Sequence, residues 1–153
     1  MSAYPSAPTG RLSPQELRAW RGMLRAHAAL TKRLDAQLEA AHGLPLTSYE
    51  VLVHVADAED ERMRMCDLAD SIAISRSGLT RLADRLERDG LIVRKSCASD
   101  ARGAFACLTA RGREVVEAAR ATHLAGVREL FLGRLSGEEQ ERLCDLWDRL
   151  LQT

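Results

Sequence analysis

Apolar residues recur at steps of three and four along most of this chain, which is the spacing of amphipathic helices. The first such stretch opens at residues 13–16 (Ser-Pro-Gln-Glu), where a capping box coincides with proline at the first helical position. Its stripe continues to about His42, and Gly43 supplies the stop signal. A stripe of that length exceeds what one small core can cover, so we expect part of this helix to pack against another chain.

Shorter elements follow the long helix. Residues 47–50 (Thr-Ser-Tyr-Glu) form a second capping-box pattern and predict a short apolar helix from that point. The acidic residues 57–61 predict a turn, residues 63–65 a short strand, and residues 67–73 a short helix. Ahead of all of these, residues 1–12 contain two prolines, a glycine and three small polar residues, and we expect a loose arm there.

The helix expected between Ile74 and Gly90 has two different faces. One is an apolar stripe made of Leu79, Leu82, Ala83 and Leu86. The other carries short hydroxyls and arginines, namely Ser75, Arg76, Ser77, Thr80, Arg81 and Arg85. Such side chains reach base edges and phosphates when a helix lies in a DNA major groove. Together with the short helix before it, this segment predicts a helix-turn-helix.

After Gly90 the period of the pattern changes. Residues 91–95 and 104–108 are two short runs rich in β-branched or apolar residues, separated by a polar, glycine-ended stretch at 98–103. They predict a β-hairpin, which in this position is a wing. A further helix is expected from Thr109, and a last one from the capping box at residues 136–139 (Ser-Gly-Glu-Glu).

Composition and charge narrow the classes of function. The 153 residues hold 22 Lys and Arg against 22 Asp and Glu, and this neutral total argues against binding a polyanion through a basic tail. Between Ser75 and Gly103, however, seven basic residues stand against four acidic ones, a local excess where DNA would lie. The sequence has no glycine-rich phosphate loop, no catalytic triad spacing and no metal motif, so we expect no enzyme, no cofactor and no metal. No stretch resembles a membrane span or a secretion signal, so we expect a cytoplasmic protein without a membrane partner.

Four segments at fixed spacing carry a family resemblance. They are Leu68-Ala69, residues 74–91 without Ala83, Asp100-Ala101-Arg102, and residues 108–112 (Leu-Thr-Ala-Arg-Gly). With them the chain resembles the MarR family of transcriptional regulators over roughly residues 14–151. The resemblance implies a mainly α, winged helix-turn-helix fold of six helices with a β-hairpin wing. It also implies one domain over 13–153, with dimerisation helices at 13–46 and 109–153 and a DNA-binding region at 47–108.

The resemblance further implies a homodimer on a near-palindromic site in double-stranded DNA, commonly a repressor that a small, often anionic aromatic ligand releases. Base contacts are expected from Ser75, Arg76, Ser77, Thr80 and Arg81 in the first two helical turns, which reach the bases. Phosphate contacts are expected from Arg85, Arg94 and Lys95. In the wing, Arg102 is expected to enter the minor groove, and Asp100 can hold an arginine in place, form an Asx-turn, or do both.

A ligand pocket is also expected, and two rival functions stay open. In the family the pocket lies near the first, second and fifth helices, where Trp20, His27, Tyr49 and His54 are the candidates, although for each residue taken alone a place in the core is the better explanation. Cys97 and Cys107 lie on opposite strands of the hairpin, and Cys66 lies near a helix start, which leaves a thiol redox switch open. The fourth cysteine is Cys144, and the family's oxidant-sensing branch uses a cysteine near the start of the first long helix, which is absent here. A winged helix that contacts another protein is the second rival, and the local basic excess argues against it.

Overall fold

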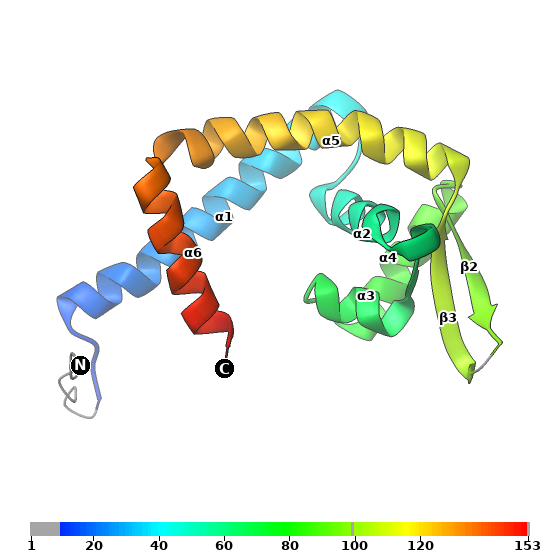
Figure 1. Cartoon of the computed structure of the whole chain (residues 1–153), viewed down its shortest axis with the longest axis horizontal. Coiled ribbons are helices and arrows are strands. Elements are labelled where there is room, and N and C mark those ends of the chain that lie inside the picture. Colours follow the sequence, from blue (N-terminus) through cyan, green and yellow to red (C-terminus); the bar gives the residue numbers. More distant parts are fainter. Residues whose placement is uncertain (1–9, 99, 153) are drawn as a thin grey trace.

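The structure is a computed structural model that describes residues 10–98 and 100–152, with the side chains of residues 97 and 100–102 outside that description. Within these residues, six α-helices and three strands follow one another, with two short 3-10 turns between them. Figure 1 shows an arch in which α5 (Ala110–Leu130) runs along the top and a winged helix forms one side. The other side consists of α6 (Gly137–Leu151) and the first half of α1 (Pro14–His42). The expected arm at 1–12 lies almost wholly outside the described residues.

The predicted boundaries of α1 are confirmed. The Ser13 Oγ accepts a hydrogen bond from the Glu16 N–H at 3.2 Å, and the Glu16 carboxylate accepts one from the Ser13 N–H at 2.7 Å. Gly43 ends the helix with φ at 60°, a left-handed conformation that glycine adopts without steric cost. Near this end the His42 Nε2 lies 2.7 Å from the Thr122 Oγ1, so a polar contact joins α1 to α5.

The start of α2 (Leu46–Asp57) differs from the prediction. The expected capping box at 47–50 is wrong, because the helix already begins at Leu46 and Pro45 occupies the cap position without a side-chain hydrogen bond. The cap comes instead from α1, where the Asp35 Oδ1 accepts a hydrogen bond from the Leu46 N–H at 2.8 Å. Ser48, which belonged to the expected box, is buried inside the helix. A cap supplied from another helix leaves no mark in the local sequence.

The core lies under the winged helix. Its largest fully buried apolar side chains are Leu38, Val51, Leu52, Val55, Leu68, Leu79, Leu86, Ile92 and Val116. The short helix α3 (Met65–Ser71) and α4 (Arg76–Arg88) both pack on it, and their predicted apolar positions Leu68, Leu79 and Leu86 are buried. The helix-turn-helix is therefore anchored through the stripe of α4, which turns the opposite face of that helix to solvent.

The wing is part of a three-stranded antiparallel sheet in the order β1-β3-β2. Its strands are β1 (Arg62–Arg64), β2 (Ile92–Cys97) and β3 (Asp100–Leu108). The expected turn at 98–103 is too long, because β3 already begins at Asp100, which pairs with Cys97 beyond a register shift in β2. Backbone pairing with β2 outweighs the turn-forming composition of this stretch.

Two ion pairs fasten α5 to the end of α2 and the turn behind it. Arg120 pairs with Asp57 at 2.7 Å, and Arg113 pairs with Glu61 of the 3-10 turn Glu59–Glu61. The far end of α5 leads through a second turn (Leu132–Arg134) into α6, whose capping box at Ser136 is confirmed. No residue of α6 is buried within the chain, although the structure describes this helix completely. The arch thus has one packed side and one side with little support of its own.

Candidate nucleic-acid interface

The helix α4 is set up by its own ends. The Ser75 Oγ accepts a hydrogen bond from the Gly78 N–H at 3.0 Å, as an N-cap side chain does. At the other end Gly90 takes a φ of 75°, and the Leu91 N–H donates to the Leu86 carbonyl at 2.9 Å. The helix therefore starts and stops where the sequence predicts, and its first turn is open to solvent.

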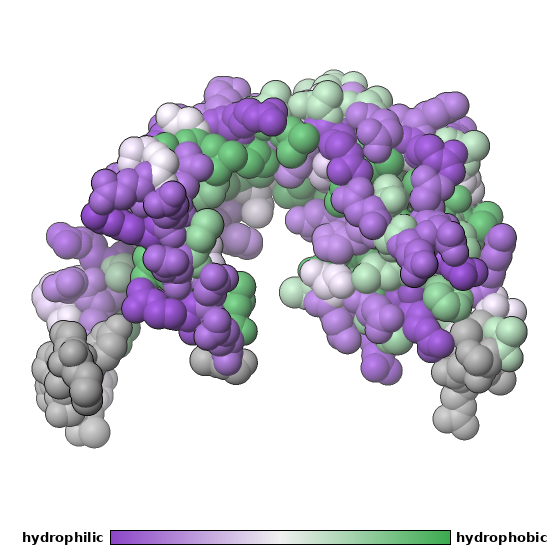
Figure 2. Space-filling model, in the orientation of Figure 1, coloured by the Kyte–Doolittle hydropathy of each residue, from purple (hydrophilic) through white to green (hydrophobic). Residues whose placement is uncertain are grey.

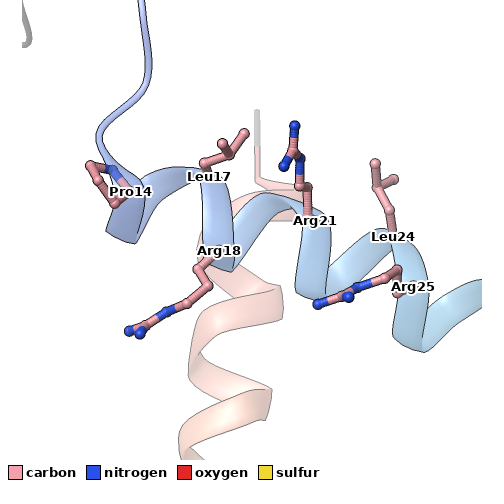
Figure 3. A pocket seen from close by; sticks show the side chains of 6 residues that line it. All are labelled: Pro14, Leu17, Arg18, Arg21, Leu24 and Arg25. Atoms are coloured by element: carbon pink, nitrogen blue, oxygen red, sulfur yellow. The ribbon is translucent and has the colours of Figure 1, made fainter.

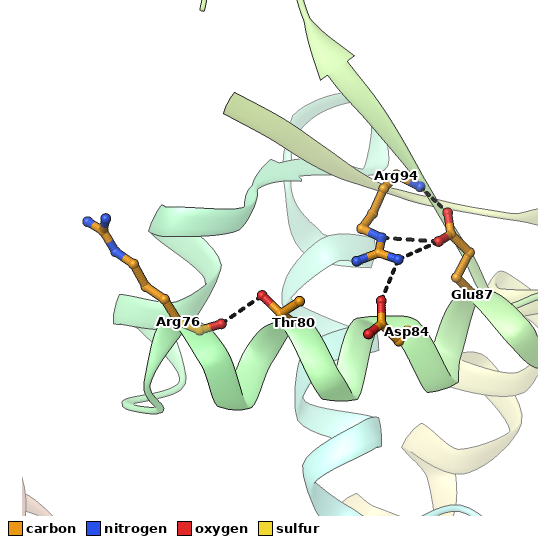
Figure 4. A network of polar contacts seen from close by, with 5 residues as sticks. All are labelled: Arg76, Thr80, Asp84, Glu87 and Arg94. Atoms are coloured by element: carbon orange, nitrogen blue, oxygen red, sulfur yellow. Dashed lines mark hydrogen bonds and ion pairs between the residues drawn. The ribbon is translucent and has the colours of Figure 1, made fainter. Parts of the chain in front are cut away.

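The six polar residues predicted to face DNA are brought together on the exposed side of this helix. Ser75, Arg76, Ser77, Thr80, Arg81 and Arg85 are all exposed. Arg76, Arg81 and Arg85 form no ion pair with any residue that the structure describes. The Thr80 Oγ1 donates to the Arg76 carbonyl at 2.9 Å, so this hydroxyl is satisfied within the helix when the protein is free (Figure 4). Free guanidinium groups on an exposed face are suited to phosphate and base-edge contacts.

Two hollows flank α4. The one toward the wing has a volume of about 440 Å³ and is lined by residues including Arg64, Cys66, Arg76 and Gly103. The one toward α2 has a volume of about 450 Å³ and is lined by Glu50, Arg81 and Arg85 among others. Burial raises the pKa of Glu50. The arginines of α4 are thus divided between two edges of the helix.

Arg94, which the sequence predicts as a phosphate contact, lies against two carboxylates of α4. Its guanidinium Nη2 lies 2.7 Å from the Glu87 Oε2 and 2.6 Å from the Asp84 Oδ1, and both carboxylates belong to α4 (Figure 4). The backbone N–H of Arg94 also donates to the Glu87 Oε1 at 2.8 Å. These hydrogen bonds, first the backbone one and then the side-chain ones, hold the pKa of Glu87 below its usual range. The neighbouring Lys95 is exposed and has no such partner among the described residues.

Sequence reasoning missed two arginines on the outer face of the sheet. The guanidinium carbons of Arg62 and Arg64 lie 5.6 and 5.5 Å from the ring centre of Phe105. Phe105 is paired with Arg64 of β1 and with Lys95 of β2, so Lys95 lies on the same face of the sheet as the two arginines. The signal was the alternation of arginines about Met63, because residues two apart on a strand share a face.

The wing tip is placed only by its backbone. Asp100 and Arg102 belong to the first residues of β3, at the end of the hairpin that points away from α5 (Figure 1). Their side chains, and therefore the expected minor-groove contact, lie outside the described residues. The register of the sheet does test the hairpin cysteines: Cys107 is opposite Val93, four residues from Cys97 along β2. At about 3.3 Å per residue this separation excludes a disulfide, so the register does not allow the approach of Cys97 and Cys107 that the sequence leaves open.

Comparison with known proteins identifies the family to which this chain belongs. A sequence model of the MarR family matches residues 42–103, which include α2, α3, α4 and the wing as far as Gly103. The transcriptional regulator HosA of Escherichia coli O127:H6 is 35% identical over 113 residues, which cover 73% of this chain and 83% of HosA. The chain belongs to the MarR family of transcriptional regulators. This confirms the resemblance drawn from the sequence, and with it the class of DNA-binding regulators rather than enzymes.

Solved structures of MarR-family members agree with the whole arch. AbsC of Streptomyces coelicolor superposes with a TM-score of 0.89 at 35% identity, covering 94% of this chain and 97% of AbsC. Sco3205 of the same organism, solved in complex with DNA, gives a TM-score of 0.88 at 35% identity over 92% of this chain and 89% of its own. The predicted winged-helix fold is confirmed.

The four ligand candidates of this MarR-family chain lie on two helices, α1 and α2. Trp20 is 53% exposed on α1, and His27 is also exposed on that helix. Tyr49 is buried, with its ring centre 4.7 Å from that of His123 on α5. The His54 Nδ1 lies 2.8 Å from the Glu50 carbonyl oxygen within α2. His123, which the sequence did not single out, is the residue that meets Tyr49, and burial lowers its pKa.

The helices α1 and α6 of this MarR-family chain expose apolar side chains on the side of the arch opposite the winged helix. Trp20 and Leu24 of α1 are 53% and 47% exposed, and Leu146 and Trp147 of α6 are 42% and 39% exposed. Figure 2 shows apolar residues along the inner side of the arch and down the side that contains α6. On α1, Leu17, Arg21 and Leu24 point to one side of an open hollow, and Arg18 and Arg25 point to the other (Figure 3).

Two classes of site are absent from the described part of the chain. No three His, Cys, Asp or Glu side chains among residues 10–98 and 100–152 lie together as metal ligands would. No helix in those ranges combines the length and the apolar character needed to cross a membrane.

Proposed function

We propose that this MarR-family regulator is a homodimeric repressor that reads a near-palindromic operator through the exposed face of α4 and the wing. The observation that carries the proposal is that Arg76, Arg81 and Arg85, which form no ion pair with any described residue, lie beside the exposed Ser75, Ser77 and Thr80. The first two turns of α4 would meet the bases, and Arg85 and Lys95 the phosphates. Arg102, with Asp100 behind it, would enter the minor groove.

The dimer is proposed from the apolar faces of α1 and α6. Monomeric proteins seldom leave large aromatic and aliphatic side chains such as Trp20, Leu146 and Trp147 exposed together. A second copy of the chain supplies the missing partner, because a two-fold axis sets these faces against their equivalents. Two copies of α4 would then enter successive major grooves about 34 Å apart.

Arg81→Ala is expected to lower discrimination between operator and random DNA by about tenfold, since a bidentate contact to a base contributes about 1–3 kcal/mol of discrimination. Gel-shift titration measures it, with a duplex selected by the wild-type protein from a random pool and a random-sequence duplex of equal length. Arg128→Ala, an exposed arginine of α5, is the matched control. An equal loss of affinity for both duplexes would show that Arg81 contacts a phosphate instead.

The rival functions give different results in the same assay. A winged helix that docks only on protein would bind neither duplex nor heparin in a salt-dependent way, whereas phosphate contacts make affinity fall steeply with salt. A thiol switch would lose DNA binding on oxidation in the wild type but not in a variant with all four cysteines replaced by serine. Repression itself is tested by transcription from a promoter that contains the selected site.

We further propose that a small aromatic acid releases the repressor by binding where α2 meets α5. Among the described residues, the buried His123 Nδ1 and the buried Gln37 Oε1 of α1 have no hydrogen-bond partner, whereas the Arg120 Nε lies 3.4 Å from the Glu117 Oε1. Buried polar atoms are normally satisfied, so the His123 Nδ1 at the Tyr49–His123 contact is available to a ligand. The site differs from the sequence-based one in that His123 replaces Trp20 and His27.

Benzoate and its hydroxylated derivatives are expected to raise the midpoint of thermal unfolding. At a concentration about 100-fold above its dissociation constant, a ligand adds about 2.7 kcal/mol to the free energy of unfolding, which is about 5–10 °C for a chain of this size. His123→Ala should abolish the shift and His27→Ala should preserve it. The reverse result would favour the pocket expected from the sequence, and the absence of any shift would refute control by these acids.

A further inference from the structure

The side chain of Arg94 connects the wing to α4 at three points. Its Nε and Nη2 donate to the Glu87 Oε2 at 3.1 and 2.7 Å, and its Nη2 reaches the Asp84 Oδ1 at 2.6 Å. Its backbone N–H donates to the Glu87 Oε1 at 2.8 Å. Asp84 and Glu87 lie three residues apart on α4, and Figure 4 shows both on the edge that faces the strand.

The side chains of Arg94, Glu87 and Asp84 link the wing to α4 at a point further along the hairpin than the turn that connects the two elements. At the turn, the Leu91 N–H donates to the Leu86 carbonyl, which fixes only the base of the hairpin. Further along β2, Arg94 makes the side-chain contacts to α4 found among the described residues. A planar guanidinium held by two carboxylates defines both a distance and an orientation.

The same contacts occupy the charge of Arg94. Its side chain is 28% exposed, and two carboxylates accept hydrogen bonds from its Nε and Nη2, which leaves only the Nη1 for a phosphate. Asp84 is itself 47% exposed on a helix that would face DNA, where a bare carboxylate repels phosphate. Arg94 therefore screens a repulsive charge as well as joining two elements.

We propose that Arg94 is a positioning residue, which together with Glu87 and Asp84 sets the wing against α4 so that major-groove and minor-groove contacts fall in register. It is not a phosphate ligand. This inference rests on the proposed DNA-binding function. It gives the acidic residues Glu87 and Asp84 a part in DNA binding, although they would not belong to a contact surface made only of basic residues.

The decisive variant is Glu87→Gln, because a phosphate-contact role and a positioning role for Arg94 predict opposite changes in DNA affinity. Removal of a negative charge near DNA strengthens binding if only electrostatics act. If Glu87 holds Arg94 in place, the neutral amide weakens binding to the selected duplex by about tenfold, the size expected for a lost charged hydrogen bond. Binding to random DNA, which needs no register between grooves, changes much less.

Arg94→Met and Lys95→Met complete the comparison as neighbours on one strand. Lys95→Met should lower the slope of log affinity against log salt by about 0.9, as the loss of one phosphate contact does. Arg94→Met should reproduce the loss of selectivity of Glu87→Gln. Exchange of the Arg94 backbone N–H should quicken in Glu87→Gln, and circular dichroism checks that each variant is folded.

The outcomes separate cleanly. Wild-type or tighter binding by Glu87→Gln, with Arg94→Met lowering affinity for both duplexes alike, would make Arg94 a phosphate contact and overturn the inference alone. A wild-type protein with no salt dependence and no preference for any selected duplex would overturn the proposed function, and this inference with it.

Discussion

Leu146→Asp is expected to give a monomer under conditions where the wild-type chain is a dimer, and to bind the selected operator at least about 100-fold more weakly. Leu146 lies on the apolar face of α6 and is 42% exposed in the single chain. A carboxylate buried there without a partner would cost several kcal/mol. Loss of the second half-site then removes the gain from linked binding, which is commonly about 10²–10⁴ in affinity.

Analytical ultracentrifugation and gel shift measure the two effects. Arg149→Asp is the matched control, because it adds the same carboxylate to the charged, exposed face of the same helix. The control should remain dimeric. If Leu146→Asp were also dimeric, the proposed interface would have to lie elsewhere than on α6.

Gly112→Ala is expected to lower the free energy of unfolding by about 3 kcal/mol, the upper range for overpacking. A Cβ at this position would lie 2.0 Å from the Leu91 carbonyl oxygen and 2.9 Å from the Leu108 Cδ1. The backbone cannot yield easily, because the Gly112 N–H donates to the Thr109 Oγ1 at 2.9 Å and the Thr109 N–H donates to Leu91 at 3.1 Å. The start of α5 would have to move away from the base of the wing.

Thermal unfolding followed by circular dichroism should show a midpoint about 6–12 °C lower. Gly137→Ala at the start of α6 is the control, since a Cβ there meets nothing within 4 Å. It should leave the midpoint unchanged or raise it slightly. A Gly112→Ala variant as stable as wild type would show that the contact between α5 and the wing is not tight in solution.

Elements fixed by local signals could be predicted from the sequence. The caps at Ser13, Ser75 and Ser136 each depend on residues within one helical turn, and each is found as expected. The stripe of α4 is buried because an apolar period of 3.6 residues needs a core wherever it occurs. For the same reason, the polar face of α4 could be identified before the fold was known.

Features that depend on distant residues could not be predicted in this way. The cap of α2 comes from Asp35 of α1. Arg94 forms ion pairs with Glu87 and Asp84, whereas its neighbour Lys95 is exposed to solvent. From the sequence alone, Arg94 and Lys95 are both predicted to contact phosphates, because the sequence does not tell which side of the strand faces a carboxylate. Likewise, the separation of Cys97 from Cys107 follows from strand register, which pairs Cys107 with Val93.

The lack of buried residues in α6 has a consequence for gene control. If this helix gains its packing only from a second copy, folding of the terminal segment and assembly are one event. Active regulator would then accumulate as the square of the chain concentration when expression is low. A cell that synthesises few copies would leave the operator open, and a modest rise in synthesis would close it over a narrow range.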